Sequence, residues 1–254
     1  MPTKNPAKSE RAISRRAKEF FKRTRTYAPG LNALLTAVRP LGEVVAFGGL
    51  LRNAALFGLS DFRSDIDLVV ALSNEEALKD VLHTFRPSRT AFGGYRFRVD
   101  SFQVDIWPLE STWAFREGLV KDVSIPNLVR TTFFNWDAIA FSLDSGRLFH
   151  REDYLDHVAK RFLDVVLAQN PNPFGMAVRT IKLLRHTSAA LSPTLVRFIV
   201  DVLENPKEGP AGARHSSRWE YQSLCAIAPL LKEHQAVSPH TALCVDWQMK
   251  FWGK

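Results

Sequence analysis

Three aspartates in the first half of the chain have the spacing of a metal site. Asp65 and Asp67 are two residues apart at the start of an apolar run that continues to Val70. Because a strand alternates its side chains between two faces, positions i and i+2 point to the same face. Two carboxylates on an otherwise buried strand repel each other unless a cation bridges them. Asp105 lies in a second apolar segment, residues 102–107, and the three carboxylates together indicate a divalent metal ion.

A glycine pair upstream of these aspartates has the features of a phosphate-binding turn. Residues 43–47, Glu-Val-Val-Ala-Phe, are mostly apolar and predict a buried strand, and Gly48 and Gly49 follow it directly. Residues 50–57 predict a short helix that ends at Gly58. Backbone N–H groups point outward at the start of a helix and can bind a phosphate. A glycine pair taken alone is more often a plain turn.

A predicted hairpin brings the third aspartate into this arrangement. Residues 96–99 and 102–107 are expected to pair around a turn at Asp100 and Ser101. Three acids on neighbouring strands, opposite a glycine turn, form a two-metal site for in-line displacement at phosphorus. One Mg²⁺ ion would activate an attacking hydroxyl, and the other would hold a triphosphate.

The same aspartates have a purely structural interpretation. Asp65 and Asp67 can be turn or capping residues, and Asp105 can be a charge at the edge of the hairpin. The order of glycine pair, short helix, Asp-x-Asp, hairpin and single Asp favours the catalytic interpretation.

The composition is that of an ordinary globular protein. Of the 254 residues, 46% are hydrophobic and 24% are charged, enough for one sizeable core or two modest ones. Two cysteines, Cys225 and Cys244, do not form a disulfide framework and indicate a reducing compartment. Because no run approaches the ~18 to 20 apolar residues of a membrane span, we expect a cytoplasmic protein without a membrane partner.

The net charge of +8 is unevenly distributed. Residues 1–26 contain nine basic and two acidic side chains, whereas residues 27–159 contain thirteen basic and seventeen acidic ones. Residues 160–254 are basic again, with twelve against seven. Basic flanks attract polyanions, and an acidic centre suits a divalent metal ion.

The N-terminal segment predicts a basic amphipathic helix over about residues 9–26. An apolar face repeats through Ile13, Ala17, Phe20 and Phe21. Another face carries a stripe of basic residues at helical spacing: Arg11, Arg15, Lys18, Lys22 and Arg25. This basic stripe is either a solvated helix surface or a contact for RNA phosphates, and the pattern leaves both possibilities open.

Several of these motifs resemble the DNA polymerase beta-type nucleotidyltransferase superfamily, and most closely the head domain of CCA-adding enzymes and bacterial poly(A) polymerases. Residues 48–53, Gly-Gly-Leu-Leu-Arg-Asn, are similar to the family's Gly-Gly-x-Val-Arg-Asp. Residues 55–58 resemble its Leu-Leu-Gly, and residues 64–68 resemble its Asp-Ile-Asp-Leu. Residues 134–141, Phe-Asn-Trp-Asp-Ala-Ile-Ala-Phe, are similar to Phe-Thr-Ile-Asn-Ala-Leu-Ala-Tyr. The resemblance spans roughly residues 43–185.

The resemblance implies roles for individual residues. It makes Asp65, Asp67 and Asp105 the catalytic metal ligands for two Mg²⁺ ions. It places Gly48 and Gly49 at the triphosphate of a bound nucleoside triphosphate such as ATP. The nucleotide side of the cleft would include Arg52 and Asn53.

The chain also departs from the family pattern. Asn53 stands where the family has Asp, and Asp137 stands where it has Asn. The family selects a base with a Glu-Asp-x-x-Arg element, but residues 169–175 read Gln-Asn-Pro-Asn-Pro-Phe-Gly. The resemblance therefore implies phosphate and metal chemistry, while strict C-C-A addition does not follow from it.

The C-terminal part predicts helices. Residues 174–186 form an amphipathic pattern with a basic edge that includes Arg179 and Lys182. These two residues are either solvated side chains of a core-packing helix or RNA contacts, since the family has such a helix beside the nucleotide. Helices are also predicted over residues 195–203 and 221–231, with a loop at 205–212, and the ending with Trp247 and Trp252 is expected to dock on the core.

Together these observations predict an α/β protein in which a nucleotidyltransferase head, with a short mixed β-sheet and helices, precedes an α-helical C-terminal domain. The expected domains are a basic helix (1–30), a metal- and NTP-binding domain (31–155) and a helical domain (156–254). The expected activity is Mg²⁺-dependent transfer of NMP from an NTP to a hydroxyl, with release of pyrophosphate. The preferred acceptor is the 3′ end of a tRNA-like RNA. The alternatives are transfer to a protein side chain or a small molecule, and a non-catalytic RNA-binding head.

Overall fold

The structure is a computed structural model that describes residues 6–72, 74–90, 92–205 and 218–245. The chain forms two compact units, one of residues 1–132 and 136–159 and the other of residues 133–135 and 160–254. Trp247 and Trp252, and most of the loop predicted at 205–212, lie outside the described residues.

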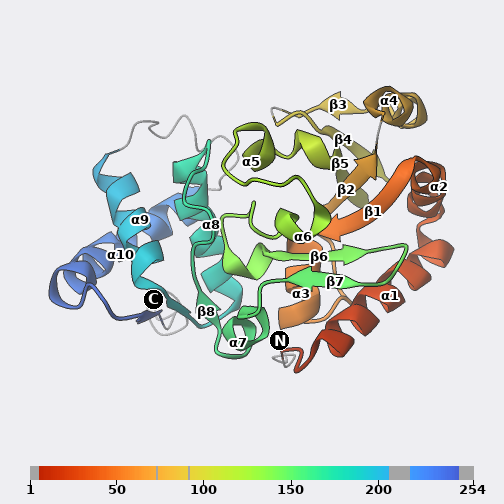
Figure 1. Cartoon of the computed structure of the whole chain (residues 1–254). Coiled ribbons are helices and arrows are strands. Elements are labelled where there is room, and N and C mark those ends of the chain that lie inside the picture. The colour runs from red at the N-terminus through yellow and green to blue at the C-terminus, as the bar shows by residue number, and fades with distance from the viewer. Residues whose placement is uncertain (1–5, 73, 91, 206–217, 246–254) are drawn as a thin grey trace. The chain divides into compact units, whose positions relative to one another are not determined.

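The first unit is built on a seven-stranded sheet with the order β3-β4-β5-β2-β1-β6-β7 (Figure 1). Neighbouring strands are antiparallel except β2 and β5, which are parallel. The prediction of an α/β fold with a mixed sheet is therefore confirmed. The strands are β1 (Gly42–Phe47), β2 (Ile66–Leu72), β3 (Ser88–Arg89), β4 (Tyr95–Val99), β5 (Phe102–Pro108), β6 (Ile139–Ser142) and β7 (Leu148–His150).

The helices that precede β2 cover one face of this sheet. The first unit contains α1 (Glu10–Tyr27), α2 (Pro29–Val38), α3 (Gly49–Leu56), α4 (Glu75–His83), α5 (Trp113–Arg116), α6 (Ile125–Leu128) and α7 (Tyr154–Ala159). Helix α1 packs against α2 and α3, and α3 packs against β1, β2 and β6. Phe20 of α1 is fully buried, with its ring centroid 5.8 Å from that of Phe102 on β5 and 5.6 Å from that of Phe62.

The alternation of burial along β4 and β5 separates this covered face from an open one. On β5, Phe102, Val104 and Ile106 are buried, whereas the residues between them are half-buried. On β4 the intervening residues, Arg96 and Arg98, are exposed. Since Phe102 contacts α1, Asp105 points to the face opposite α1.

The hairpin between β4 and β5 is tied to a helix at its turn. Asp100 has a left-handed backbone, with φ of 52°, a conformation that Asp tolerates better than most residues. Its Oδ2 atom accepts a hydrogen bond of 2.9 Å from the N–H of Leu31 in the first turn of α2. The turn therefore also caps α2, which fixes the hairpin against the helical layer.

The second unit contains helices α8 (Pro173–His186), α9 (Pro193–Glu204) and α10 (Arg218–Val237), as the sequence predicts, with somewhat different ends. A small sheet of β10 (Leu243–Val245), β9 (Ala189–Leu191) and β8 (Phe162–Leu163) accompanies them. The sequence analysis does not predict this sheet, because strands of two or three residues have too few positions to show a period. Within the described residues, every helix is too short or too polar to cross a lipid bilayer.

Candidate active site

Asp67 and Asp105 lie side by side on the open face of the sheet. They are register partners in the parallel pair of β2 and β5, so both side chains project from the same face. Asp65 lies just before β2, and its Oδ2 atom accepts a 3.0 Å hydrogen bond from Nε2 of Gln103. Because Gln103 is two residues before Asp105 on β5, the register of the two strands brings all three carboxylates to one region.

The glycine turn lies next to Asp67. Gly48 ends β1 with φ of 62°, in the left-handed region that favours glycine, and is the N-cap residue of α3. A Cβ atom added to Gly48 or Gly49 would lie 3.9 or 4.0 Å from Oδ2 of Asp67. The N–H of Gly48 donates to the carbonyl of Ile139 on β6, at 3.1 Å, so the first-turn N–H groups of α3 are the donors that the turn offers to an anion.

An arginine that the sequence analysis did not single out is bound to the third carboxylate. Nε and Nη2 of Arg96 donate to Oδ1 and Oδ2 of Asp105 at 2.7 and 2.6 Å, a bidentate geometry that gives strong pairing. The hydrogen bond with Asp105 and the charges of Asp105, Asp65 and Asp67 raise the pKa of the Arg96 guanidinium above its ordinary value, although partial burial opposes this. Arg96 is thus a cation bound to the acidic cluster in this structure.

The donor set fits a divalent metal ion, but the arrangement differs from the prediction. Carboxylate oxygens are the ligands that Mg²⁺ prefers, and Asp67 and Asp105 are close enough in register to share an ion. Within the described residues, no three carboxylates, histidines or cysteines converge on one point. Both oxygens of Asp105 accept hydrogen bonds from Arg96, so a metal ion at Asp105 would compete with this guanidinium for the carboxylate.

The residues predicted to line the nucleotide side have structural partners. Nη1 of Arg52 lies 2.5 Å from Oδ1 of Asp137, and both side chains are largely buried. The backbone carbonyl of Asn53 accepts from the N–H groups of Phe57 and Gly58, at 2.9 and 2.8 Å, and so closes α3. Arg52 remains beside the turn, since its Nη2 atom is 3.6 Å from the Cβ position of Gly49. Asp137, at the position where the resembling family has Asn, is therefore the ion-pair partner of Arg52.

The predicted RNA-binding residues fall in both units. The five residues of the basic stripe, Arg11, Arg15, Lys18, Lys22 and Arg25, are all exposed, while Ile13, Ala17 and Phe20 on the other side of α1 are buried. In the second unit, Lys182 is exposed and Arg179 is half-buried on α8. Since α1 packs on the covered face of the sheet, the stripe and the acidic cluster lie on different sides of the first unit.

Residues 169–175, which lack the base-selecting pattern of the resembling family, contain the start of a helix. Oδ1 of Asn170 accepts from the N–H of Asn172 at 2.8 Å. Oδ1 of Asn172 in turn accepts from the N–H of Gly175 at 2.8 Å and caps α8. These amides act as turn and cap residues, which gives the divergent sequence a structural explanation.

Similar folds occur among solved structures. The chain superimposes on a CCA-adding enzyme in complex with ATP, with a TM-score of 0.56 and 15% identity over 95% of this chain and 58% of that one. It also superimposes on a tRNA-processing enzyme in an apo form (TM-score 0.54, 16% identity, 80% and 59% coverage). A tRNA nucleotidyltransferase complexed with a primer tRNA and an incoming ATP analogue gives a TM-score of 0.50 and 15% identity, with 81% and 62% coverage.

This chain has the fold of a CCA-adding enzyme head. The resemblance predicted from the motifs is thus confirmed at the level of the fold. The chain spans less than two thirds of the length of these solved structures. Its sequence matches no protein-family model and none of the curated proteins.

Proposed function

We propose that this protein is a metal-dependent nucleotidyltransferase that moves an NMP unit from an NTP to a hydroxyl at the 3′ end of an RNA. The observation that carries the proposal is the position of Asp67. This aspartate is in register with Asp105 on one side and within about 4 Å of the Gly48–Gly49 turn on the other. A triphosphate at the turn would therefore lie against a pair of carboxylates.

The residues divide the reaction between them. The first turn of α3 would bind the phosphates through backbone N–H groups, and Asp65, Asp67 and Asp105 would hold the metal ions. Two Mg²⁺ ions would neutralise the phosphate charge and make the acceptor hydroxyl a better nucleophile. The acceptor oxygen bonds to the α-phosphorus, the bond to the bridging oxygen breaks, and pyrophosphate leaves. Once Arg96 has left Asp105, a carboxylate oxygen of this aspartate would accept the proton of the hydroxyl.

Two observations support an RNA acceptor. The five residues of the basic stripe on α1 are exposed and regularly spaced, which suits a row of phosphates. The solved structures with this fold include one with a primer tRNA and one with ATP. We therefore favour an RNA acceptor over a protein side chain or a small molecule.

The test is incubation of the full chain with each α-labelled triphosphate, Mg²⁺, and either total RNA or total protein. Label that migrates with RNA, and is absent with the Asp67→Ala variant, is the expected result. Label on protein would assign the transfer to a different acceptor. Absence of label on RNA, protein and small molecules alike would contradict the proposed activity.

A further inference from the structure

A cavity of about 280 Å³ opens beside the acidic cluster within the first unit. Asp67 and Asp105 form part of its wall, together with Arg96. The rest of the lining is rich in aromatic side chains: Phe47, Phe92, Tyr95, Trp107 and Trp113. Ligand pockets of this kind pair apolar walls with a few polar groups, and this volume fits one ring-bearing unit better than several.

The aromatic walls are held in fixed orientations. Nε1 of Trp107 donates to Oγ1 of Thr112 at 3.0 Å, and the Trp107 ring meets that of Phe47 edge-on, with centroids 6.4 Å apart. The guanidinium of Arg89 lies 4.2 Å from the centre of the Tyr95 ring. The Tyr95 hydroxyl donates to Oε1 of Glu75 at 3.1 Å. Burial and this hydrogen bond raise the pKa of Tyr95 to about 12, so the hydroxyl stays protonated at neutral pH.

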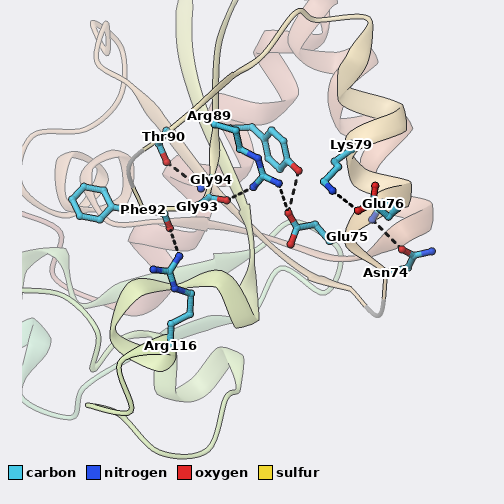
Figure 2. Close-up of polar contacts among 11 residues, drawn as sticks. Asn74, Glu75, Glu76, Lys79, Arg89, Thr90, Phe92, Gly93, Gly94 and Arg116 are labelled. Carbon is cyan, nitrogen blue, oxygen red and sulfur yellow. Dashed lines mark hydrogen bonds and ion pairs between the residues drawn. The ribbon is translucent and has the colours of Figure 1, made fainter.

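The turn before β4 supplies a further wall and is itself braced, as Figure 2 shows. Oγ1 of Thr90 accepts from the N–H of Gly94 at 3.0 Å. Nη1 of Arg89 donates to the carbonyl of Gly93 at 2.7 Å, while its Nη2 atom donates to Glu75 at 2.8 Å. The ring of Phe92 points away from this polar network and is 48% exposed. This turn thus presents an apolar ring beside the cavity.

The position of the cavity distinguishes it from the phosphate turn. The glycine turn follows β1, whereas most of the lining comes from β4, β5, the turn before β4, and residues 111–114 around the start of α5. Asp67 and Asp105 lie between the two. In the strand order, β4 and β5 lie on one side of β2, and β1 lies on the other. A group among the β4 and β5 residues would therefore meet the carboxylates from the side away from the glycine turn, as the attacking hydroxyl of an in-line displacement must.

From this geometry we propose that the cavity binds the terminal nucleobase of the acceptor strand by stacking on its aromatic walls. The proposal rests on the proposed function, since it assigns the acceptor side of the same site. Every base has a π-face, so stacking tolerates any sequence. It also places the terminal ribose, which is attached to that base, next to Asp105. The aromatic cavity thereby orients the 3′ hydroxyl without reading the identity of the base.

Binding measurements without turnover test this directly. We would measure the affinity of a short 5′-labelled RNA and, separately, of ATP and CTP, for the wild type and for Phe92→Ala and Trp113→Ala. The matched control is Tyr27→Ala, which removes an aromatic ring that is 49% exposed and does not line the cavity. The two cavity variants should weaken RNA binding by about 5- to 150-fold, the range that stacking of one base supplies. Their affinities for ATP and CTP should stay within about twofold of the wild type, and so should all the affinities of Tyr27→Ala.

A second RNA, whose terminal nucleotide lacks its base, makes the test specific. It should bind the wild type more weakly by a similar factor, and Phe92→Ala should weaken it no further. Loss of triphosphate binding instead of RNA binding would assign the cavity to the incoming nucleotide and overturn the proposal. Equal RNA affinity for wild type and both cavity variants would overturn it as well.

The experiments distinguish a failure of the cavity assignment from a failure of the proposed nucleotidyl transfer. Binding that depends on Phe92 and Trp113 without any nucleotidyl transfer would leave the cavity assignment standing and remove the activity. Nucleotidyl transfer that is unchanged by both substitutions would support the activity and overturn the cavity assignment.

Discussion

Arg96 binds both carboxylate oxygens of Asp105, at 2.6 and 2.7 Å, across the hairpin of β4 and β5. The guanidinium is half exposed while the carboxylate is largely buried, so the arginine can leave toward solvent. The single positive charge of Arg96 thus neutralises the carboxylate of Asp105, which in the proposed reaction would bind a divalent metal ion. Arg96 would therefore compete with a metal ion for the carboxylate of Asp105.

The first prediction follows from this competition. Arg96→Gln should tighten Mg²⁺ or Mn²⁺ binding by about fivefold, because an ion pair with one exposed partner contributes roughly 1 kcal/mol at most. The matched control is Arg98→Gln, which removes the same charge from the same face of β4 opposite Gln103. Calorimetry with the metal alone measures both variants. Equal changes in the two would show that general charge, and not the Arg96–Asp105 pair, sets the affinity.

Asp105 itself is predicted to act on the acceptor. Asp105→Asn keeps the shape of the side chain and removes its charge, so transfer should fall by at least ~100-fold, whereas triphosphate binding with Mg²⁺ should change little. Single-turnover kinetics and equilibrium binding separate these two effects. If triphosphate binding is lost together with turnover, Asp105 has a different role from the one assigned.

Asp65 and Asp67 are predicted to be indispensable for transfer but dispensable for folding. Asp65→Ala and Asp67→Ala should each abolish transfer, and the melting temperature should be unchanged or higher, because removing one carboxylate relieves like-charge repulsion. Asp80→Ala, on the exposed side of α4, is the control for a surface aspartate. Turnover within tenfold of the wild type in either site variant would exclude that residue as a metal ligand.

Glu75 is predicted to make the bracing of the turn before β4 sensitive to acid. Burial would raise its pKa, but hydrogen bonds from Arg89 and Tyr95 outweigh that effect and hold the pKa below its ordinary value of 4.5. A lowered folded-state pKa means that the stabilisation is present above about pH 4.5 and is lost as the pH falls through the folded-state value. Wild type should therefore be more stable than Glu75→Gln near pH 6, and the difference should shrink steadily as the pH falls below the ordinary value of 4.5. A constant difference across this range would show that the charge of Glu75 contributes nothing.

The basic stripe is predicted to serve long RNA and not short RNA, because α1 packs on the covered face of the sheet. Deleting the helix would remove the buried Phe20 and unfold the unit, so the test is Arg15→Gln, Lys18→Gln and Lys22→Gln combined. The slope of log affinity against log salt should fall by about two units for a long RNA, at ~0.7 to 0.9 per phosphate contact, and stay unchanged for a trinucleotide. The control, Lys79→Gln, Lys121→Gln and Lys232→Gln combined, removes equal charge elsewhere. An unchanged slope would identify the stripe as a solvated surface.

A feature of the site can be predicted from the sequence when the residues that form it are close together in the chain. The glycine turn, the start of β2 and the hairpin are local patterns, and each is present where the sequence predicts it. The sequence also contains enough information to predict the pairing of Arg96 with Asp105. In a hairpin that turns at Asp100 and Ser101, counting back along both strands places position 96 opposite position 105.

Other features depend on pairings that no local pattern contains. The parallel pairing of β2 with β5 needs a crossover through α4, the edge strand β3 and its neighbour β4. The register that matches Asp67 with Asp105 follows only from that topology. The aromatic cavity likewise combines Phe92, Trp107 and Trp113 from separate segments, and the ring of Trp113 on a four-residue helix has no periodic signal to reveal it.

The most direct test of the central claim, that the Asp67–Asp105 pair beside the glycine turn transfers a nucleotide to a 3′ hydroxyl, is the mass of a defined RNA oligomer after reaction. The oligomer is incubated with Mg²⁺ and ATP or CTP, and pyrophosphate is measured in parallel. Wild type is predicted to add whole nucleotide units with one pyrophosphate released per unit, and to add none when the RNA carries a 3′-deoxy end or when Asp67 is replaced by Ala. Extension by the Asp67→Ala variant, or an unchanged oligomer with every triphosphate and a broad set of RNAs, would contradict the account.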